Sequence, residues 1–481
     1  MLKINNDGDF TKMTFTTCPE LEILLREITN EIIDSGDNKN IKKVYENCLE
    51  EYPILKNYSL IIGTNDTKND YFHKTITNNL NEKSFYDYNT KQDICINHPF
   101  MDYTNILFLS KNHLKNNLPT FDYTVFVDSN AINFFHKFYM SPKENKNTYI
   151  DFIIKNKVDM NYLPYILEDY INKHHKNPQF KRTWDKIKSF EIVNNFDKEY
   201  YTLTGKIKFD QKLLESEGYN SVRNFIEDKK FYFANFFERK NAKEIILPNK
   251  SLYYSGKKVI DFNGYFSQYW LIYGYVLNIL IEKHSKNSTE DKIHNILKNM
   301  CSNGQELKHI LYFAYLYFER DFELELNKFF NFDFVTQSYD EVLEKARNIT
   351  WDIFLYITTQ NFLTKPLKRV GDIEFKADIG IPLFLTEDKK LYNSFIKHYS
   401  LQIVIVDETS DLRPFNGLST KMQLDYSFMD MLISFHSKYI NEHIRKKIIF
   451  KKFKKTSNVY AIRLLFKERM ERKFKKFWLL K

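Results

Sequence analysis

The chain has 481 residues, of which 43% are hydrophobic and 28% are charged, and its net charge is +9. This length indicates two or three domains, and the hydrophobic content is that of a globular protein rather than a disordered one. The cysteines include no Cys-x-x-Cys pair, which argues against a disulfide framework or a thiolate zinc site and fits a reducing cytoplasm; they are Cys18, Cys48, Cys95 and Cys301.

No apolar signal core or cleavage-site pattern opens the sequence, so we expect a cytoplasmic location. The most apolar run, residues 265–281, is interrupted by Ser267, Gln268 and Asn278. It is slightly shorter than the roughly 20 residues needed to cross a bilayer. A buried helix is therefore predicted there, and no membrane span.

Residues 1–120 form an N-terminal α/β region to which the sequence assigns no chemistry. Apolar residues recur at helical spacing in two segments, and Asn and Asp clusters then indicate loops. The predicted elements are helices at 19–33 and 40–49, loops at 64–70 and 76–90, and a strand at 105–109.

Two short apolar runs end abruptly in a carboxylate. Val125-Phe-Val is followed by Asp128, and Leu383-Phe-Leu is followed by Thr386-Glu-Asp388. Each run is typical of a buried parallel strand followed by a polar turn and a helix. Because ligands of open α/β sheets collect at the carboxyl edge of the strands, both aspartates are candidate site residues.

Two helical segments between these strands each carry another carboxylate. Glu168 lies in the segment 158–170, and Asp352 follows Trp351 at the predicted start of a strongly apolar helix. An unpaired carboxylate buried there would be costly unless a cation compensated its charge.

In this order the four acids resemble the pattern of the PIN-like nuclease superfamily: an Asp ending the first strand, a Glu on an early helix, an Asp starting a later helix, and a Thr-x-Asp after the fourth strand. The resemblance covers residues 121–172 and about 305–408, including a last strand at 401–406. It implies a parallel sheet flanked by helices, in which Asp128, Glu168, Asp352 and Asp388 bind one or two Mg²⁺ or Mn²⁺ ions. It also implies that Ser129, Asn130 and Thr386 support these ligands through hydrogen bonds.

Asp352 comes 184 positions after Glu168, which is too far for a compact βα domain and predicts an insertion. The resulting domains are the N-terminal region 1–120, a PIN-like core at 121–408 with a mixed α/β insertion at about 175–300, and a basic helical region at 409–481. The insertion is expected to form a largely separate lobe. Further predicted elements are a strand pair at 200–209, extended runs at 244–248 and 258–262, helices within 265–300, 306–318 and 339–346 with Ser338 as a cap, and helices at 424–439 and from 448 onward.

Each acid also has an ordinary structural interpretation. Asp128 and Asp388 can cap the helices that follow them, Asp352 can stabilise a helix dipole, and Glu168 can face solvent beside Asp169.

The positive charge is concentrated at the C-terminus. Residues 443–481 contain 15 Lys or Arg and two Glu, which leaves a net −4 on residues 1–442. Such a tail favours a polyanion. Because Phe, Leu and Trp alternate with the basic residues, a membrane-surface helix is the alternative.

Together these features predict a metal-dependent endonuclease that cleaves RNA or single-stranded DNA, with RNA favoured, and with the tail at 443–481 as the polyanion contact. The alternative is an inactive PIN-like scaffold that binds nucleic acid or assembles with partners. Lys, Asn, Ile, Tyr and Phe, which AT-rich codons encode, are in excess in the sequence. An AT-rich bacterial or mobile-element origin would suit a toxin or phage-defence effector.

Overall fold

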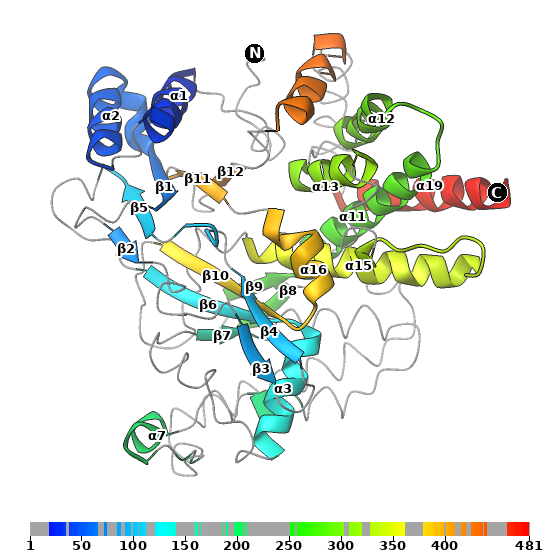
Figure 1. The fold of residues 1–481 in the computed structure, drawn as a ribbon, viewed down its shortest axis with the longest axis horizontal. Coiled ribbons are helices and arrows are strands. Elements are labelled where there is room, and N and C mark those ends of the chain that lie inside the picture. The colour runs from blue at the N-terminus through cyan, green and yellow to red at the C-terminus, as the bar shows by residue number, and fades with distance from the viewer. Residues whose placement is uncertain are drawn as a thin grey trace.

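The computed structural model shows a mixed α/β chain in which two five-stranded sheets lie beside a group of helices (Figure 1). The structure describes residues 19–34, 38–65, 72–74, 84–87, 92–97, 100–103, 105–111, 121–140, 159–161, 165, 186, 189–190, 197–204, 206, 208, 251–254, 257–302, 307–319, 328–360, 379–398, 401–408, 415–419, 425–435, 437–439 and 459–480.

The first sheet is entirely antiparallel. Its strand order is β12 (Phe415–Ser419), β11 (Leu401–Asp407), β1 (Tyr58–Thr64), β5 (Asn105–Leu109) and β2 (Phe72–Lys74). Helices α1 (Pro19–Asp34) and α2 (Asn38–Glu51) share a hydrophobic core with β1, β5 and β11. The 3-10 helix η2 (Pro53–Asn57) joins α2 to β1.

The second sheet is mixed, and it carries the two strands that end in carboxylates. Its strand order is β3 (Ser84–Asp87), β4 (Gln92–Asn97), β10 (Ile379–Thr386), β6 (Phe121–Val127) and β7 (Asp159–Asn161). Strands β10, β6 and β7 are parallel, whereas β3 and β4 are antiparallel to their neighbours. The two apolar runs that were predicted to be buried parallel strands, residues 125–127 and 383–385, are therefore parallel neighbours in this sheet.

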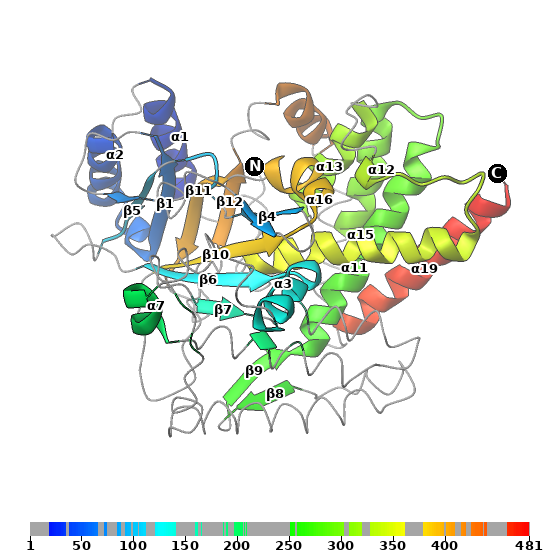
Figure 2. The ribbon, with the colours of Figure 1, turned by 60° about the horizontal axis from the view of Figure 1, so that its bottom comes forward.

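Five helices form what we call the helical lobe: α11 (Phe262–Lys283), α12 (Thr289–Ser302), α13 (Lys308–Glu319), α15 (Tyr339–Gln360) and α19 (Val459–Leu479). Figure 2 shows α11, α15 and α19 together on one side of the molecule. One hydrophobic core contains residues of all five helices and also Phe126 of β6 and Phe384 of β10. The described insertion helices α11 and α12 are thus packed into the same core as the second sheet, rather than forming a separate lobe.

Shorter elements complete the described chain. They are α3 (Ser129–Met140), α7 (Lys198–Thr204), the hairpin of β8 (Ser251–Tyr254) and β9 (Lys257–Asp261), α16 (Lys389–Ser394), η5 (Ile396–His398), and helical turns at 426–435 and 437–439.

The pairing of the strands differs from the domain boundaries predicted from the sequence. Strands β3 and β4 come from the N-terminal region but extend the sheet of β6 and β10, and β3 falls within the predicted loop at 76–90. Strand β11 forms where a last strand was expected, but it pairs with β1 in the first sheet. A buried apolar run specifies a strand but not its partner, so these pairings were not accessible from periodicity.

The prediction of a strand pair at 200–209 was wrong for its first half, because residues 198–204 form helix α7. The alternation of Tyr and Thr resembles a strand, but Asp197 starts a helix by accepting the Tyr200 backbone N–H at 2.8 Å. The predicted run at 244–248 lies outside the described residues.

The long apolar segment is a buried helix, as predicted. Tyr269, Ile272 and Leu280 of α11 have no exposed surface. Within the described ranges, no helix has the length and apolar character that a membrane crossing requires.

Candidate functional site

Asp128 and Thr386 lie side by side at the carboxyl edge of the second sheet. The register pairs Val127 with Leu385, and Asp128, the residue directly after β6, continues the ladder by donating its backbone N–H to the Leu385 carbonyl at 3.0 Å. The Thr386 hydroxyl then donates to Asp128 Oδ2 at 2.8 Å. Parallel pairing of two strands that are distant in sequence therefore brings these side chains into contact.

Burial sets the protonation behaviour of Asp128. Its side chain is almost completely buried, and the pKa of the carboxyl is raised to about 6, with this loss of hydration as the largest cause. Hydrogen bonds from Thr386 and from the Ser129 backbone N–H, which lies 2.7 Å from Oδ1, lower the pKa and oppose this effect. The negative charge of Asp388 is a further cause of the raised pKa, so the two aspartates interact electrostatically.

Asp388 is held by the same threonine. Its backbone N–H donates to Thr386 Oγ1 at 3.0 Å, so one buried hydroxyl bridges Asp128 and Asp388. Asp388 is also the N-cap of α16, because its Oδ1 accepts the backbone N–H groups of Lys390 and Leu391 at 2.8 and 3.0 Å. The capping role that the sequence allowed for Asp388 is therefore present.

The two carboxylates differ in the oxygens that remain available. Both oxygens of Asp128 accept hydrogen bonds, Oδ1 from Ser129 and Oδ2 from Thr386. Asp388 is half-buried, and its Oδ2 accepts no hydrogen bond from the described part of the chain. A cation at this edge would therefore meet one open carboxylate oxygen and a second, buried carboxylate that already has two donors.

Asp352 is not at the start of a helix, which corrects the sequence prediction. Helix α15 runs without a break from Tyr339 to Gln360, and Asp352 lies in its second half. The helix starts at the capping box of Ser338 and Glu341, in which the Glu341 N–H donates to Ser338 Oγ at 3.3 Å and the Ser338 N–H donates to Glu341 Oε2 at 2.7 Å. No Gly or Pro lies between Ala346 and Asp352 to end the helix there.

Helix α15 nevertheless reaches the second sheet. The ring of Tyr356, one turn beyond Asp352, packs against Phe384 of β10 with the ring centroids 6.1 Å apart. Asp352 itself is half-buried. No group of three His, Cys, Asp or Glu side chains with a metal-binding arrangement occurs in the described ranges, so Asp352 does not join Asp128 and Asp388 in such a group.

The remaining predicted residues are only partly described. Glu168 and the side chain of Asn130 lie outside the described residues. Ser129 is the first residue of α3 and contributes its backbone N–H to Asp128.

Glu387 is a further acid in the same turn that the sequence analysis had not selected. It is half-buried, with a buried Oε1, and it lies between Thr386 and Asp388. Its position inside the Thr-Glu-Asp run was the only signal in the sequence.

Comparisons with models of protein families, with characterised proteins and with solved structures found no match to this chain.

Proposed function

We propose that the chain is a metal-dependent nuclease of PIN-like type, with Asp128 and Asp388 as two of its metal ligands. One observation carries the proposal: these two residues, which follow two parallel strands, are joined through the Thr386 hydroxyl at one edge of the sheet. Open α/β sheets bind their ligands at this edge.

The donor set suits a hard cation. Mg²⁺ and Mn²⁺ prefer carboxylate oxygens, and Asp388 Oδ2 is open to such a ligand. Burial and the charge of Asp388 both raise the pKa of Asp128, so a cation between the two groups would relieve an unfavourable interaction. A bound divalent ion supplies an activated water and neutralises the leaving oxygen in phosphodiester cleavage.

The protein groups have distinct roles in this proposal. Asp128 and Asp388 hold the cation, and Thr386 fixes the orientation of both. Glu168 and Asp352 remain expected ligands. Because Asp352 forms no metal-binding group with Asp128 and Asp388 in the part of the chain that the structure describes, α15 or its side chains would have to move for Asp352 to bind the same cation. We infer RNA as the preferred substrate and a role as a toxin or phage-defence effector from the sequence, and the cytoplasm as the site of action.

The alternative function is that of an inactive scaffold that binds nucleic acid. It is favoured by the hydrogen bonds already made at the site: Asp388 Oδ1 caps α16, and both oxygens of Asp128 have donors. In a scaffold, Asp128, Thr386 and Asp388 would have only a structural role, in which their hydrogen bonds hold the starts of α3 and α16 against the sheet.

Cleavage assays on conservative variants separate these functions. The full chain is incubated with total RNA and with plasmid DNA, with and without Mn²⁺, alongside Asp128→Asn and Asp388→Asn. Asparagine is as good an N-cap as aspartate, so Asp388→Asn retains the cap and loses only the charge. For a nuclease, we expect Mn²⁺-dependent cleavage by the wild type and at least a hundred-fold loss in each variant.

Asp425→Asn is the matched control. Asp425 also caps a helix, by accepting the Phe428 backbone N–H at 3.2 Å, and it accepts the Tyr315 hydroxyl at 3.3 Å. It directly precedes the helical segment 426–435 and is not at the edge of the second sheet. Cleavage should therefore survive this change. A wild-type chain without metal-dependent cleavage, or one whose cleavage is unaffected by Asp128→Asn and Asp388→Asn, would favour the scaffold.

A further inference from the structure

Helix α19 places its apolar side chains in the core of the helical lobe. Phe466, Met470 and Phe474 are buried, and they recur at spacings of four residues along one face of the helix. The Phe466 ring packs against Tyr275 of α11 with centroids 5.3 Å apart. Much of the basic C-terminal region is thus a fixed structural helix rather than a loose tail.

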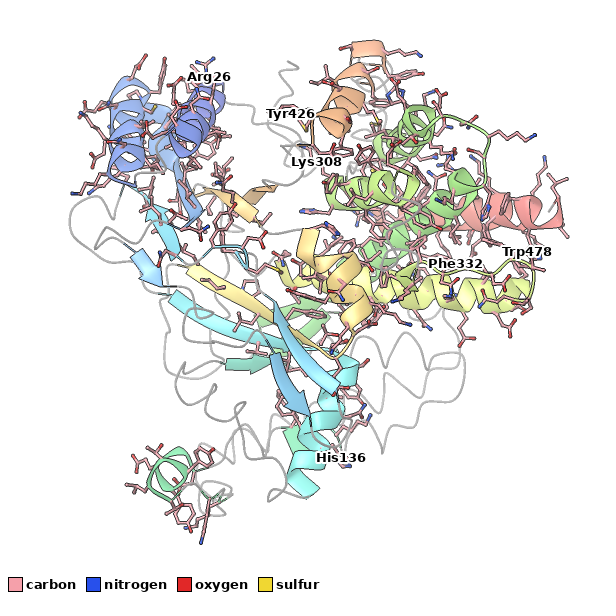
Figure 3. The ribbon with its side chains drawn as sticks, viewed as in Figure 1. Arg26, His136, Lys308, Phe332, Tyr426 and Trp478 are labelled. Carbon is pink, nitrogen blue, oxygen red and sulfur yellow. The ribbon has the colours of Figure 1, made fainter. Side chains whose placement is uncertain are left out.

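The aromatic residues at the end of α19 are also used in packing. Trp478 lies 5.5 Å from Phe334 and 5.9 Å from Tyr339, measured between ring centroids, and Phe477 stacks on His284 at 5.7 Å. Figure 3 shows Trp478 at the outer end of the helical lobe. A helix lying on a membrane inserts such aromatic residues into the lipid boundary. These rings contact protein and are therefore not available to insert into lipid. Leu479 and Leu480 are the exposed apolar side chains at this end of α19 that could still do so.

The exposed surface of α19 carries a group of cations, which we call the basic ridge: Arg469, Arg472, Lys473, Lys475 and Lys476. Four of its members follow the spacing i, i+3, i+4 and i+7, so they share one face and extend along about 10 Å of helix. Among the described residues, Lys473, Lys475 and Lys476 have no ion-pair partner.

The two acids of α19 neutralise little of this charge. Glu471 pairs with Lys467, which is outside the ridge, at 3.2 Å between the carboxylate and ammonium groups. Glu468 is the other acid. Helix α19 carries seven Lys or Arg and two Glu, whereas residues 1–442 together have a net charge of −4. The ridge is therefore a local positive surface on a chain whose residues 1–442 are net acidic.

We propose that the basic ridge binds the sugar-phosphate backbone of a nucleic acid. Phosphate contacts from Lys and Arg supply most of sequence-independent binding. A preformed helix presents these cations without the entropy cost of ordering the backbone on binding. The role of the bound strand as substrate rests on the proposed function, but the binding itself requires none of the carboxylates. In Figure 1 and Figure 2 the C-terminal end of α19 lies at the outer edge of the helical lobe, away from the second sheet. The ridge would therefore hold a part of the strand remote from the candidate site.

Binding in the absence of divalent metal tests this proposal independently of cleavage. Deletion of the tail is unsuitable, because it would remove Phe466, Met470 and Phe474 from the core. The test variant is Lys473→Gln/Lys475→Gln/Lys476→Gln in the full chain. The control is Lys39→Gln/Lys43→Gln/Lys56→Gln, which removes the same charge from exposed lysines in or near α2. Circular dichroism confirms that each variant is folded.

The probes are a single-stranded RNA 20-mer, a DNA 20-mer of the same sequence, and vesicles of phosphatidylcholine with 30% phosphatidylserine, with the salt concentration varied. We expect the ridge variant to bind RNA roughly ten-fold more weakly, and the slope of log affinity against log salt to fall by about two units, at about 0.7 for each lost single-strand contact. The control should retain the wild-type affinity and slope. Equal losses of affinity for RNA and for DNA would indicate that the ridge recognises only the charge of the phosphate backbone.

Two results would overturn the proposal. In the first, the ridge variant and the control have the same affinity and salt slope for both oligonucleotides. In the second, the ridge variant loses vesicle binding but retains oligonucleotide binding, which would identify the ridge as a membrane contact. Loss of binding in the ridge variant while Asp128→Asn still binds would support the ridge even if no cleavage is detected.

Discussion

Thr386 donates a hydrogen bond to Asp128 across 258 residues of sequence, and the same hydroxyl accepts the backbone N–H of Asp388. Thr386 is completely buried, so it can have no water in place of these partners. The Asp128 carboxylate after β6 and the Asp388 backbone N–H after β10 therefore depend on one side chain.

Thr386→Val is predicted to destabilise the chain by about 1–3 kcal/mol, because Asp128 Oδ2 and the Asp388 N–H would each lose a buried partner. Valine fills nearly the same volume, so packing changes little. Thr386→Ser retains the hydroxyl and serves as the control. The free energy of unfolding is measured by urea denaturation, and equal stability of the Val and Ser variants would show that the bridge contributes nothing.

Asp128 should make stability depend on pH in an unusual direction for an aspartate. Its folded-state pKa is raised to about 6 from an ordinary 3.8, so the folded state binds the proton more tightly than the unfolded state. The associated stability is fully present below about pH 4 and is lost as the pH rises through 6. Relative to Asp128→Asn, which does not titrate, the wild type should lose on the order of 2–3 kcal/mol between pH 4 and pH 7.

The measurement is the difference in unfolding free energy between the wild type and Asp128→Asn at several pH values, without divalent metal. Taking this difference removes the contribution of other titrating groups. A difference that is constant from pH 4 to pH 7 would mean that folding does not raise the pKa of Asp128. A difference that shifts in favour of the wild type as the pH rises would mean that the hydrogen bonds of Asp128 outweigh its burial.

The edge of the second sheet could be predicted from the sequence because its signal is local. The apolar runs that end at Asp128 and Thr386 are short, and their ends coincide with the strand ends in the structure. What periodicity cannot encode is the partner of each strand. Thus β11 was expected in the sheet of β10 but pairs with β1, where Ile405 opposes Leu60 and contributes to the core under α1 and α2.

The site was harder to predict than the sheet. Asp352 follows Trp351 in a strongly apolar run, which resembles a helix start, but the Ser338 and Glu341 capping box sets the beginning of α15 about four turns earlier. A cap fixes where a helix begins, and without a breaker the helix continues through any later candidate start. The two described insertion helices α11 and α12 share a core with Phe126 and Phe384, which the sequence does not show. Their pattern is amphipathic or apolar, but it does not indicate which surface they cover.

Asp388 offers a way to separate capping from metal binding. Asp388→Ala removes the acceptor for the Lys390 and Leu391 N–H groups and should cost about 1 kcal/mol, whereas Asp388→Asn should be close to neutral without metal. Saturating Mn²⁺ at about 100 times its dissociation constant should stabilise the wild type by about 2.7 kcal/mol through linkage. Neither variant should gain this increment, and chelation with EDTA should return the wild type to its metal-free melting temperature. An equal Mn²⁺-induced shift in all three proteins would place any cation elsewhere.

Gly274 fixes how closely α19 approaches α11. A Cβ at this position would overlap the ring of Phe466, which is itself almost completely buried and cannot move aside freely. Gly274→Ala should gain up to about 1 kcal/mol in helix propensity but lose more through the clash, so that the net destabilisation is about 1–3 kcal/mol.

The clash can be tested by a double-mutant cycle with Phe466→Leu, which makes room for the added methyl group. If Gly274 is required by its contact with Phe466, Gly274→Ala should be less destabilising in the Phe466→Leu background, with a coupling energy of about 1 kcal/mol or more. Because α19 carries the basic ridge, displacement of the helix in Gly274→Ala should also weaken oligonucleotide binding, and Phe466→Leu should partly restore it. Strictly additive effects on stability would mean that the two helices are farther apart than the contact between Gly274 and Phe466 requires.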